Sequence, residues 1–156
     1  MSSQARGVPH AADAPLREAT SSLGYLFKHA QLRLAELTGP ALAPFGISGR
    51  ELAVLLTLAA GEPASQQEAA QRLGVDRTSM VGLVDALETK NLVARRPQEG
   101  DRRRNVVELT GTGRDTLRRA SEAAAEVERE FLAPLSPAAA AQFTRALRTL
   151  VPPPGA

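Results

Sequence analysis

Cysteine is absent from this sequence, which excludes disulfides, thiolate metal sites and cysteine nucleophiles. Histidine is scarce: with only His10 and His29, a zinc site would need mainly carboxylate ligands, which zinc uses less readily than nitrogen or sulfur. We therefore predict no metal site and no cofactor. Aromatic residues make up 3% of the chain, so its core must be built from leucine, alanine and valine.

Long apolar runs are missing as well. No stretch approaches the roughly 20 residues that a membrane-spanning helix needs, and the opening MSSQARGVPHAADAP lacks the apolar centre of a signal peptide. We therefore expect a cytoplasmic protein with no membrane partner. The 156 residues, 43% hydrophobic and 23% charged, are typical of one globular domain.

Lysine supplies only two of the 19 basic residues, so arginine carries most of the positive charge. Residues 72–104 hold eight basic and five acidic side chains, a local net charge of +3, whereas the remainder of the chain carries −1. Basic charge gathered in one segment indicates a negatively charged partner such as nucleic acid.

The ordered body is expected over residues 15–150, between flexible tails at 1–14 and 151–156. Apolar residues at helical spacing predict a long first helix over Leu16–Leu37, ended by Gly39-Pro40. Its apolar face consists of Leu23, Leu26, Phe27, Ala30, Leu34 and Leu37.

Cap residues predict three further helices. Ser48 and Ser65 are each followed three residues later by a glutamate, Glu51 and Glu68, which is the capping-box pattern, and Asp76 is a third cap. The helices are expected from Ser48 to about Ala60, from Ser65 to Gly74, and from Asp76 to about Asn91. The last of these has an apolar stripe of Met80, Leu83, Val84 and Leu87.

The hydrophobic period then changes to two residues over Leu92–Arg96 and Asn105–Thr110, which predicts a β-hairpin. Between these strands, Pro97–Arg104 is expected to form a long basic loop at the tip. Two helices are expected to follow, over Arg114–Leu132 with start signals at Thr112 and Asp115, and from Ser136-Pro137 to Leu150. The predicted fold class is therefore mainly α with a small β-hairpin.

The two helices joined at Leu73-Gly74-Val75 have the spacing of a helix-turn-helix motif. Ala70 lets the helices cross closely, and Gly74 supplies the positive φ that the turn demands. Followed by a basic hairpin, the motif becomes a winged helix, in which a helix enters the major groove and the hairpin reaches a minor groove. An ordinary helical corner beside a solvated charged turn is the alternative interpretation.

Five short segments, in this order along the chain, resemble the MarR family of bacterial transcriptional regulators. They are Leu73–Thr78, Leu83–Glu88, Asn91–Val93, Asp101–Arg103 and Val107–Thr110. The resemblance covers about residues 16–150. It implies a winged helix-turn-helix at about 48–110 and dimerisation helices at about 15–38 and 112–150. It also implies a homodimer on a pseudo-palindromic operator in double-stranded DNA, usually a repressor released by a small ligand.

Apolar helix surface independently favours a dimer. The helices at the two ends of the chain carry more apolar surface than one small core can use, so a second copy is expected to cover it. A two-fold dimer would place the two recognition helices roughly 34–36 Å apart, about one turn of DNA.

The resemblance assigns the residues of the wing. Asp101 takes the position of the family's wing aspartate and Arg103 that of the minor-groove arginine, which the acid orients through a charge-assisted pair. Arg102 and Arg104 are expected to contact phosphates.

On the expected recognition helix, the apolar stripe leaves five residues facing outward. They are Arg77, Thr78, Val81, Gly82 and Asp85. We expect Arg77 to read a guanine edge and Val81 to touch a thymine methyl group. Many relatives carry arginine at the positions of Gly82 or Ala86, so base reading here depends on few residues.

Two further groups of residues leave alternatives open. Ser65, Gln66 and Gln67 are candidates for phosphate contacts, and capping of the helix is an equal alternative. The family's effector pocket suggests an aromatic or phenolic ligand near Tyr25, His29, Phe45 and Arg50. The alternative is that Tyr25 and Phe45 belong to the core and His29 is a partly exposed helix residue.

Two other classes of protein compete with a specific regulator. An enzyme is least favoured, because the chain has no Ser/His/Asp grouping and no glycine-rich phosphate loop. A non-specific DNA architectural protein, or a winged helix that binds protein, is favoured by the modest net charge of +2.

Overall fold

The computed structural model of the chain describes residues 20–151, and of residues 102–104 the backbone alone. The expected tails at 1–14 and 151–156 lie outside this range except for Val151, as does the start of the first predicted helix. The elements in order are α2 (Leu23–Leu42), the 3-10 helix η2 (Ala43–Phe45), α3 (Gly49–Ala59), α4 (Gln66–Leu73), α5 (Arg77–Thr89), β1 (Val93–Gln98), β2 (Asp101–Leu109), α6 (Gly111–Leu132) and α7 (Pro137–Leu150). The predicted fold class, mainly α with one small hairpin, is confirmed.

The first long helix continues through Gly39 and Pro40, so the predicted end at this pair is wrong. α2 begins after Ser22, whose hydroxyl accepts a hydrogen bond from the Tyr25 N–H at 3.2 Å, and it ends at Leu42. Pro40 lies in the last turn, where its missing N–H costs the helix a single hydrogen bond. Because Leu42 is fully buried in the core, packing of this last turn outweighs that loss.

The three predicted caps are confirmed. The Ser48 N–H donates to Glu51 at 2.7 Å and the Glu51 N–H donates to the Ser48 hydroxyl at 3.2 Å, completing the capping box of α3. Ser65 makes the same box at the start of α4. The Asp76 carboxylate accepts from the Ser79 N–H at 2.9 Å at the start of α5.

The strands of the hairpin are longer than predicted, and the prediction of a long basic loop over Pro97–Arg104 is wrong. β1 and β2 are antiparallel and pair from Val93↔Leu109 to Pro97↔Asn105, with a register shift before Gln98↔Asp101. The turn between the strands is short and contains Gly100, whose φ is +85°. Pro97 has no N–H to donate to a neighbouring strand, so the sequence around it is typical of a loop. In the structure, however, β1 continues past Pro97 and Gln98 pairs with Asp101.

The helix after the hairpin starts earlier than predicted. Thr110 caps α6, since its hydroxyl accepts from the Gly113 N–H at 2.9 Å while donating to the Asn91 carbonyl at 2.7 Å. The start signals proposed at Thr112 and Asp115 are therefore inside the helix. The cap of α7 by Ser136, with Pro137 at its first position, is confirmed.

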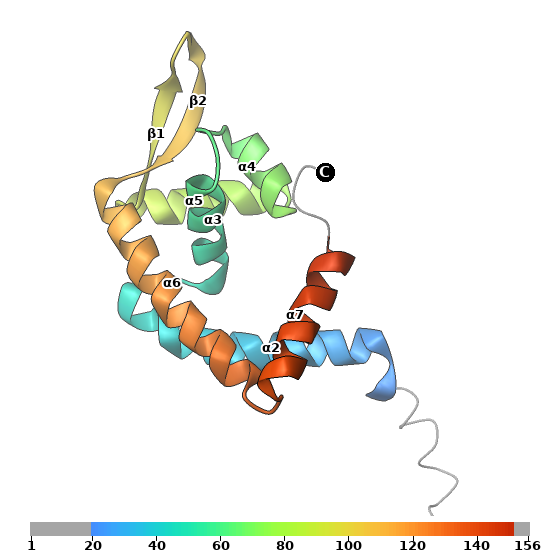
Figure 1. The fold of residues 1–156 in the computed structure, drawn as a ribbon. Helices are drawn as coiled ribbons and strands as arrows, with labels where there is room; N and C mark the ends of the chain where they lie inside the picture. The colour runs from blue at the N-terminus through green and yellow to red at the C-terminus, as the bar shows by residue number, and fades with distance from the viewer. Residues whose placement is uncertain (1–19, 152–156) are drawn as a thin grey trace, which may run out of the picture.

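The core lies between α3, α5, α6 and the base of the hairpin. Its largest fully buried side chains are Leu42, Leu55, Met80, Leu87, Val54, Val84, Val93 and Val107. Figure 1 shows the hairpin projecting from one end of the molecule and α2 at the other, with α6 running between them. Within the described residues no single helix passes a test of length and apolarity for a membrane span, whereas the bent pair Leu23–Phe45 and Gly49–Ala59 passes it together.

Candidate nucleic-acid interface

α4 and α5 cross at a tight turn, as predicted. Gly74 caps α4 with a φ of +70°, and the Val75 N–H donates to the Ala70 carbonyl at 3.1 Å. Ala70 is buried where the helices approach each other. The turn therefore fixes the direction in which α5 leaves α4.

α5 has one face in the core and one face in solvent. Met80, Val84 and Leu87 are fully buried, which fixes the rotation of the helix about its axis. The five residues predicted to face outward are all exposed: Arg77, Thr78, Val81, Gly82 and Asp85. Their exposure is confirmed, and their contact with DNA remains a prediction.

The middle of this outward face has little side-chain bulk. Val81 is 37% exposed, and a Cβ built on Gly82 would meet nothing within 4 Å. The fold itself therefore does not require glycine at position 82. A helix surface of this kind can approach the floor of a groove closely.

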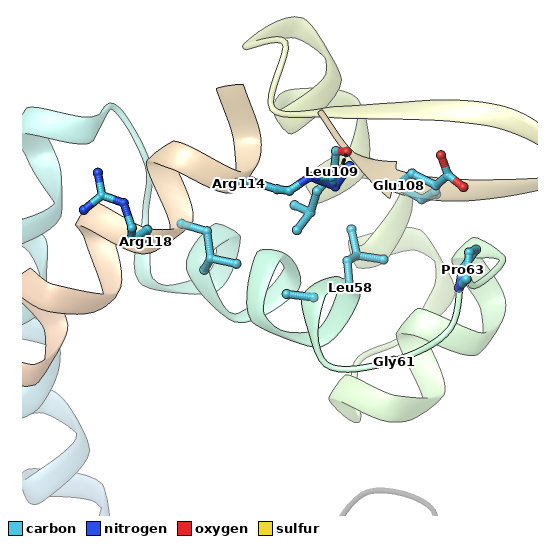
Figure 2. A pocket seen from close by; sticks show the side chains of 10 residues that line it. Leu58, Gly61, Pro63, Glu108, Leu109, Arg114 and Arg118 are labelled. Atoms are coloured by element: carbon cyan, nitrogen blue, oxygen red, sulfur yellow. Dashed lines mark hydrogen bonds between the residues drawn. The ribbon is translucent and has the colours of Figure 1, made fainter. Parts of the chain in front are cut away.

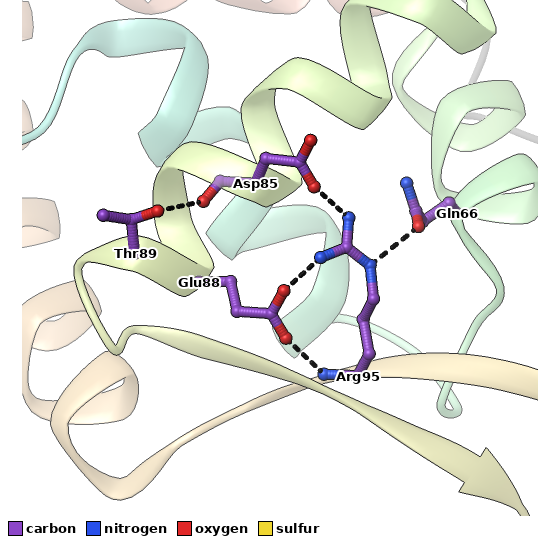
Figure 3. A network of polar contacts seen from close by, with 5 residues as sticks. All are labelled: Gln66, Asp85, Glu88, Thr89 and Arg95. Atoms are coloured by element: carbon purple, nitrogen blue, oxygen red, sulfur yellow. Dashed lines mark hydrogen bonds and ion pairs between the residues drawn. The ribbon is translucent and has the colours of Figure 1, made fainter.

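Arg95 of β1 joins the hairpin to both motif helices (Figure 3). Its Nε donates to the Gln66 side-chain oxygen of α4 at 3.0 Å, and its other guanidinium nitrogens form ion pairs with Asp85 and Glu88 of α5. Burial by itself would lower the pKa of Arg95, but the hydrogen bonds and charges of the two carboxylates outweigh it and raise that pKa. This network was not predicted from the sequence.

The base of the hairpin is attached to the segment before α4. The Val107 N–H donates to the Ala64 carbonyl at 2.8 Å, and both residues are buried. Asp101 is exposed at the start of β2, beside the turn. The side chains of Arg102, Arg103 and Arg104 lie outside the described residues, so their expected contacts remain predictions.

Ser65, Gln66 and Gln67 lie at the start of α4. The Ser65 hydroxyl caps the helix and also donates to Glu68 at 2.8 Å, so the capping alternative is what the structure shows for this residue. Gln66 accepts the hydrogen bond from Arg95, and Gln67 is exposed. Phosphate contacts by the three residues remain a prediction.

Comparison with known proteins agrees with this arrangement. A family model described as the MarR family matches residues 45–104. A solved transcriptional repressor, CouR, bound to a 23-mer DNA duplex is 34% identical to this chain, with a TM-score of 0.79 and coverage of 85% of this chain and 94% of CouR. The chain belongs to the MarR family.

Two further similar proteins are a repressor and a family member solved with a small ligand. The HTH-type transcriptional repressor NicR of Pseudomonas putida is 29% identical over 96 residues, which cover 62% of this chain. The chain spans 61% of the length of NicR. The Mycobacterium tuberculosis MarR family protein Rv2887, solved in complex with salicylic acid, is 27% identical, with a TM-score of 0.72 and coverage of 84% and 97% of the two chains.

The four residues expected near an effector are spread over this MarR-family chain. Tyr25 and His29 stack on the first half of α2, with ring centroids 3.8 Å apart. Phe45 follows the other end of α2, about 25 Å of helix from Tyr25, and lies under the Arg119 guanidinium at 5.4 Å. Arg50 lines a separate hollow beside the Gly74 turn. A single chain therefore does not bring these four residues together.

A different hollow gathers apolar and cationic groups (Figure 2). It measures about 490 Å³ and lies between the end of α3, the base of β2 and the first turns of α6. Leu58, Leu109 and Leu117 contribute apolar surface, while Arg114 and Arg118 line it from α6. We call it the α3–β2–α6 hollow. Within the described part of the chain, no group of three histidine or carboxylate side chains is placed to hold a metal ion.

Proposed function

We propose that the chain is a homodimeric repressor that binds a pseudo-palindromic operator in double-stranded DNA. α5 would lie in the major groove and the β1–β2 hairpin would reach the minor groove beside it. The observation that carries this proposal is the exposed face of α5, which holds Arg77, Thr78 and Val81 while its opposite face is locked in the core. Its support from relatives is the DNA-bound CouR and the repressor NicR.

Dimerisation is proposed from apolar side chains that one chain leaves uncovered. They lie on the first half of α2 and on α7, a helix that buries none of its residues in the single chain. The most exposed are Leu23, Leu26, Phe27, Leu32, Phe143 and Leu150. A second copy covering both helices would remove this surface from water and set two α5 helices about 34–36 Å apart.

Release by a small molecule is proposed at the α3–β2–α6 hollow. Its leucines suit the body of an aromatic or phenolic ligand. Arg114 suits an acidic group, whereas the Arg118 guanidinium is already paired with Asp115 and Glu122, and Glu108 also lines the hollow. The salicylic acid complex of Rv2887 supports this chemistry. The hollow touches α6 and β2 together, so a ligand there would act on both the wing and the long helix.

DNA binding is tested by fluorescence anisotropy with DNA from upstream of the chain's own gene. We expect two protomers per site, resistance to unrelated competitor DNA, and affinity that falls steeply with salt as counterions are released. A non-specific architectural protein would lose its DNA to competitor and protect no inverted repeat. A winged helix that binds protein would show no measurable affinity for any duplex.

The effector step is tested by titrating salicylate into the protein–DNA complex. Release that Leu117→Trp abolishes, with DNA affinity retained, supports the α3–β2–α6 hollow. Release that Tyr25→Ala abolishes instead supports the residues first predicted from the family. Absence of release by salicylate and by neutral phenols refutes an effector of this class.

A further inference from the structure

The outward face of α5 ends in two carboxylates. Thr78, Val81, Asp85 and Glu88 follow one another at helical spacing, so the acids continue the stripe that is proposed to face DNA. The side chains of Asp85 and Glu88 are 59% and 41% exposed. Without a partner, both would repel the phosphates of a duplex lying along this helix.

Arg95 is the partner of both acids. Its side chain is only 24% exposed, less than either carboxylate that it pairs with. The backbone N–H of Arg95 also donates to Glu88 at 3.2 Å, so both the main chain and the side chain of Arg95 form hydrogen bonds with Glu88. With Nε bound to Gln66 at 3.0 Å, the guanidinium donates from all its nitrogens to two different helices. These donors are turned toward the protein rather than toward solvent.

Position on the strand makes this contact a structural link. Arg95 pairs across the hairpin with Val107, the residue whose N–H is bound to the Ala64 carbonyl just before α4. The paired residues Arg95 and Val107 thus attach the hairpin at two points. The Val107 backbone binds the segment before α4, and the Arg95 guanidinium binds α5. A planar guanidinium with five donors can make these bonds at once, and a lysine ammonium cannot match that fork geometry.

We propose that Arg95 is a positioning residue for DNA binding: it neutralises the Asp85–Glu88 pair and holds the hairpin at a fixed angle to α5. It does not contact DNA itself. This inference rests on the proposed function. It also changes how the basic segment is interpreted, because one arginine of residues 72–104 serves the protein and not the phosphates.

Arg95→Ala tests the inference when specific and non-specific duplexes are compared at several salt concentrations. We expect specific affinity to fall by about tenfold or more, equivalent to about 1.4 kcal/mol, and non-specific affinity to fall less. The slope of log K against log[salt] should stay unchanged, because no phosphate contact is lost. Loss of folded protein alone would lower both affinities in proportion and leave their ratio unaltered.

Arg96→Ala is the matched control, since it removes the same charge from the next position of β1. Its side chain is 66% exposed and pairs only at 3.5 Å with Glu108 among the described residues. As a residue available to phosphates, it should lower both affinities together and make the salt slope less steep by about one. The same behaviour in Arg95→Ala would overturn the inference.

Two further variants keep the test decisive if Arg95→Ala folds poorly. Arg95→Lys retains the charge without the fork, and we expect it to recover less than half of the lost discrimination in free energy. Asp85→Asn with Glu88→Gln retains Arg95 and removes the acids, so non-specific affinity should rise while the specific-to-non-specific ratio falls. The inference is overturned if the ratio of specific to non-specific affinity is unchanged both in Arg95→Lys and in Asp85→Asn with Glu88→Gln. A wild-type chain that binds no specific duplex would instead refute the proposed function.

Discussion

Replacing Lys90 by methionine should destabilise the fold through a residue 39 positions away. Lys90 Nζ lies 2.6 Å from Glu51 Oε1, and the Glu51 side chain is only 7% exposed, whereas that of Lys90 is 38% exposed. The pair joins the start of α3 to the end of α5, where Lys90 is the C-cap. Methionine retains most of the stem and removes the charge, so the test isolates the ion pair.

The expected loss of stability depends on the hydrogen bonds that Glu51 retains when Lys90 is replaced. Removing one partner of a buried ion pair costs about 3–5 kcal/mol, because a buried charge is left without compensation. Here the Ser48 N–H still donates to Glu51 at 2.7 Å and water reaches the Lys90 side, so we expect about 1–3 kcal/mol. Urea unfolding at fixed protomer concentration should show a lower midpoint with an unchanged m-value.

The pH dependence gives a second readout of the same pair. Burial alone would raise the pKa of Glu51, but hydrogen bonds from Lys90 and Ser48 and the charge of Lys90 outweigh it and lower that pKa. A lowered pKa gives stability that is present above the ordinary pKa of glutamate and lost as pH falls through the folded value. Lys90→Met should weaken this acid-side loss or reverse its sign.

A double variant separates charge from packing. Adding Glu51→Gln to Lys90→Met removes the uncompensated carboxylate while an amide can still cap α3, so the double variant should be more stable than Lys90→Met alone. A stability change of less than about 0.5 kcal/mol in Lys90→Met, with the wild-type pH dependence retained, would show that the Lys90–Glu51 pair does not stabilise the fold.

Substitutions of four glycines by alanine should change stability in different directions. Gly113→Ala would place a Cβ 1.9 Å from the Leu92 carbonyl oxygen, so we expect a loss of about 3 kcal/mol or more in urea unfolding, while Gly111→Ala, with nothing within 4 Å, should not lower stability. Gly82→Ala should increase the stability of the fold by up to about 1 kcal/mol, seen as a higher thermal midpoint. The same substitution should weaken specific DNA binding measured by anisotropy. Equal or tighter binding would contradict a close approach of α5 to DNA at position 82. Gly74→Ala should cost about 1–2 kcal/mol in urea unfolding because its φ is +70°, and a smaller loss would show that the turn relaxes.

Local signals in the sequence were enough for much of the fold. A capping box connects residues three apart, so the starts of α3 and α4 could be predicted without knowing what packs against them. The buried stripe of α5 likewise follows from helical spacing, and it correctly placed Arg77 and Val81 on the outside.

Errors arose where packing between distant segments overrides local preference. α2 passes Pro40 because Leu42, two residues later, belongs to the core. Strand pairing past Pro97 depends on β2 lying alongside it, and composition alone indicates a loop. The end of α2 and the length of the β1–β2 hairpin therefore cannot be predicted from the local sequence alone.

The site residues that were missed are held by long-range contacts. Arg95 reaches Gln66, 29 residues earlier, and no spacing rule connects a strand arginine to a helix start at that distance. The one available signal was a carboxylate pair three residues apart, Asp85 and Glu88, close before an arginine on a strand. The α3–β2–α6 hollow has no sequence signal, because it exists only where three elements meet.

We propose that this chain reads DNA through α5 and the wing formed by β1 and β2. The most direct test compares Arg77→Ala and Arg103→Ala with Arg118→Ala, which removes the same charge from α6 outside the proposed interface. Measured as competitor-resistant anisotropy on one operator, Arg77→Ala and Arg103→Ala should each weaken binding by about tenfold or more, with the dimer intact, and Arg118→Ala should bind like wild type. Equal affinity of the wild type and the three variants would show that α5 and the wing do not bind this DNA.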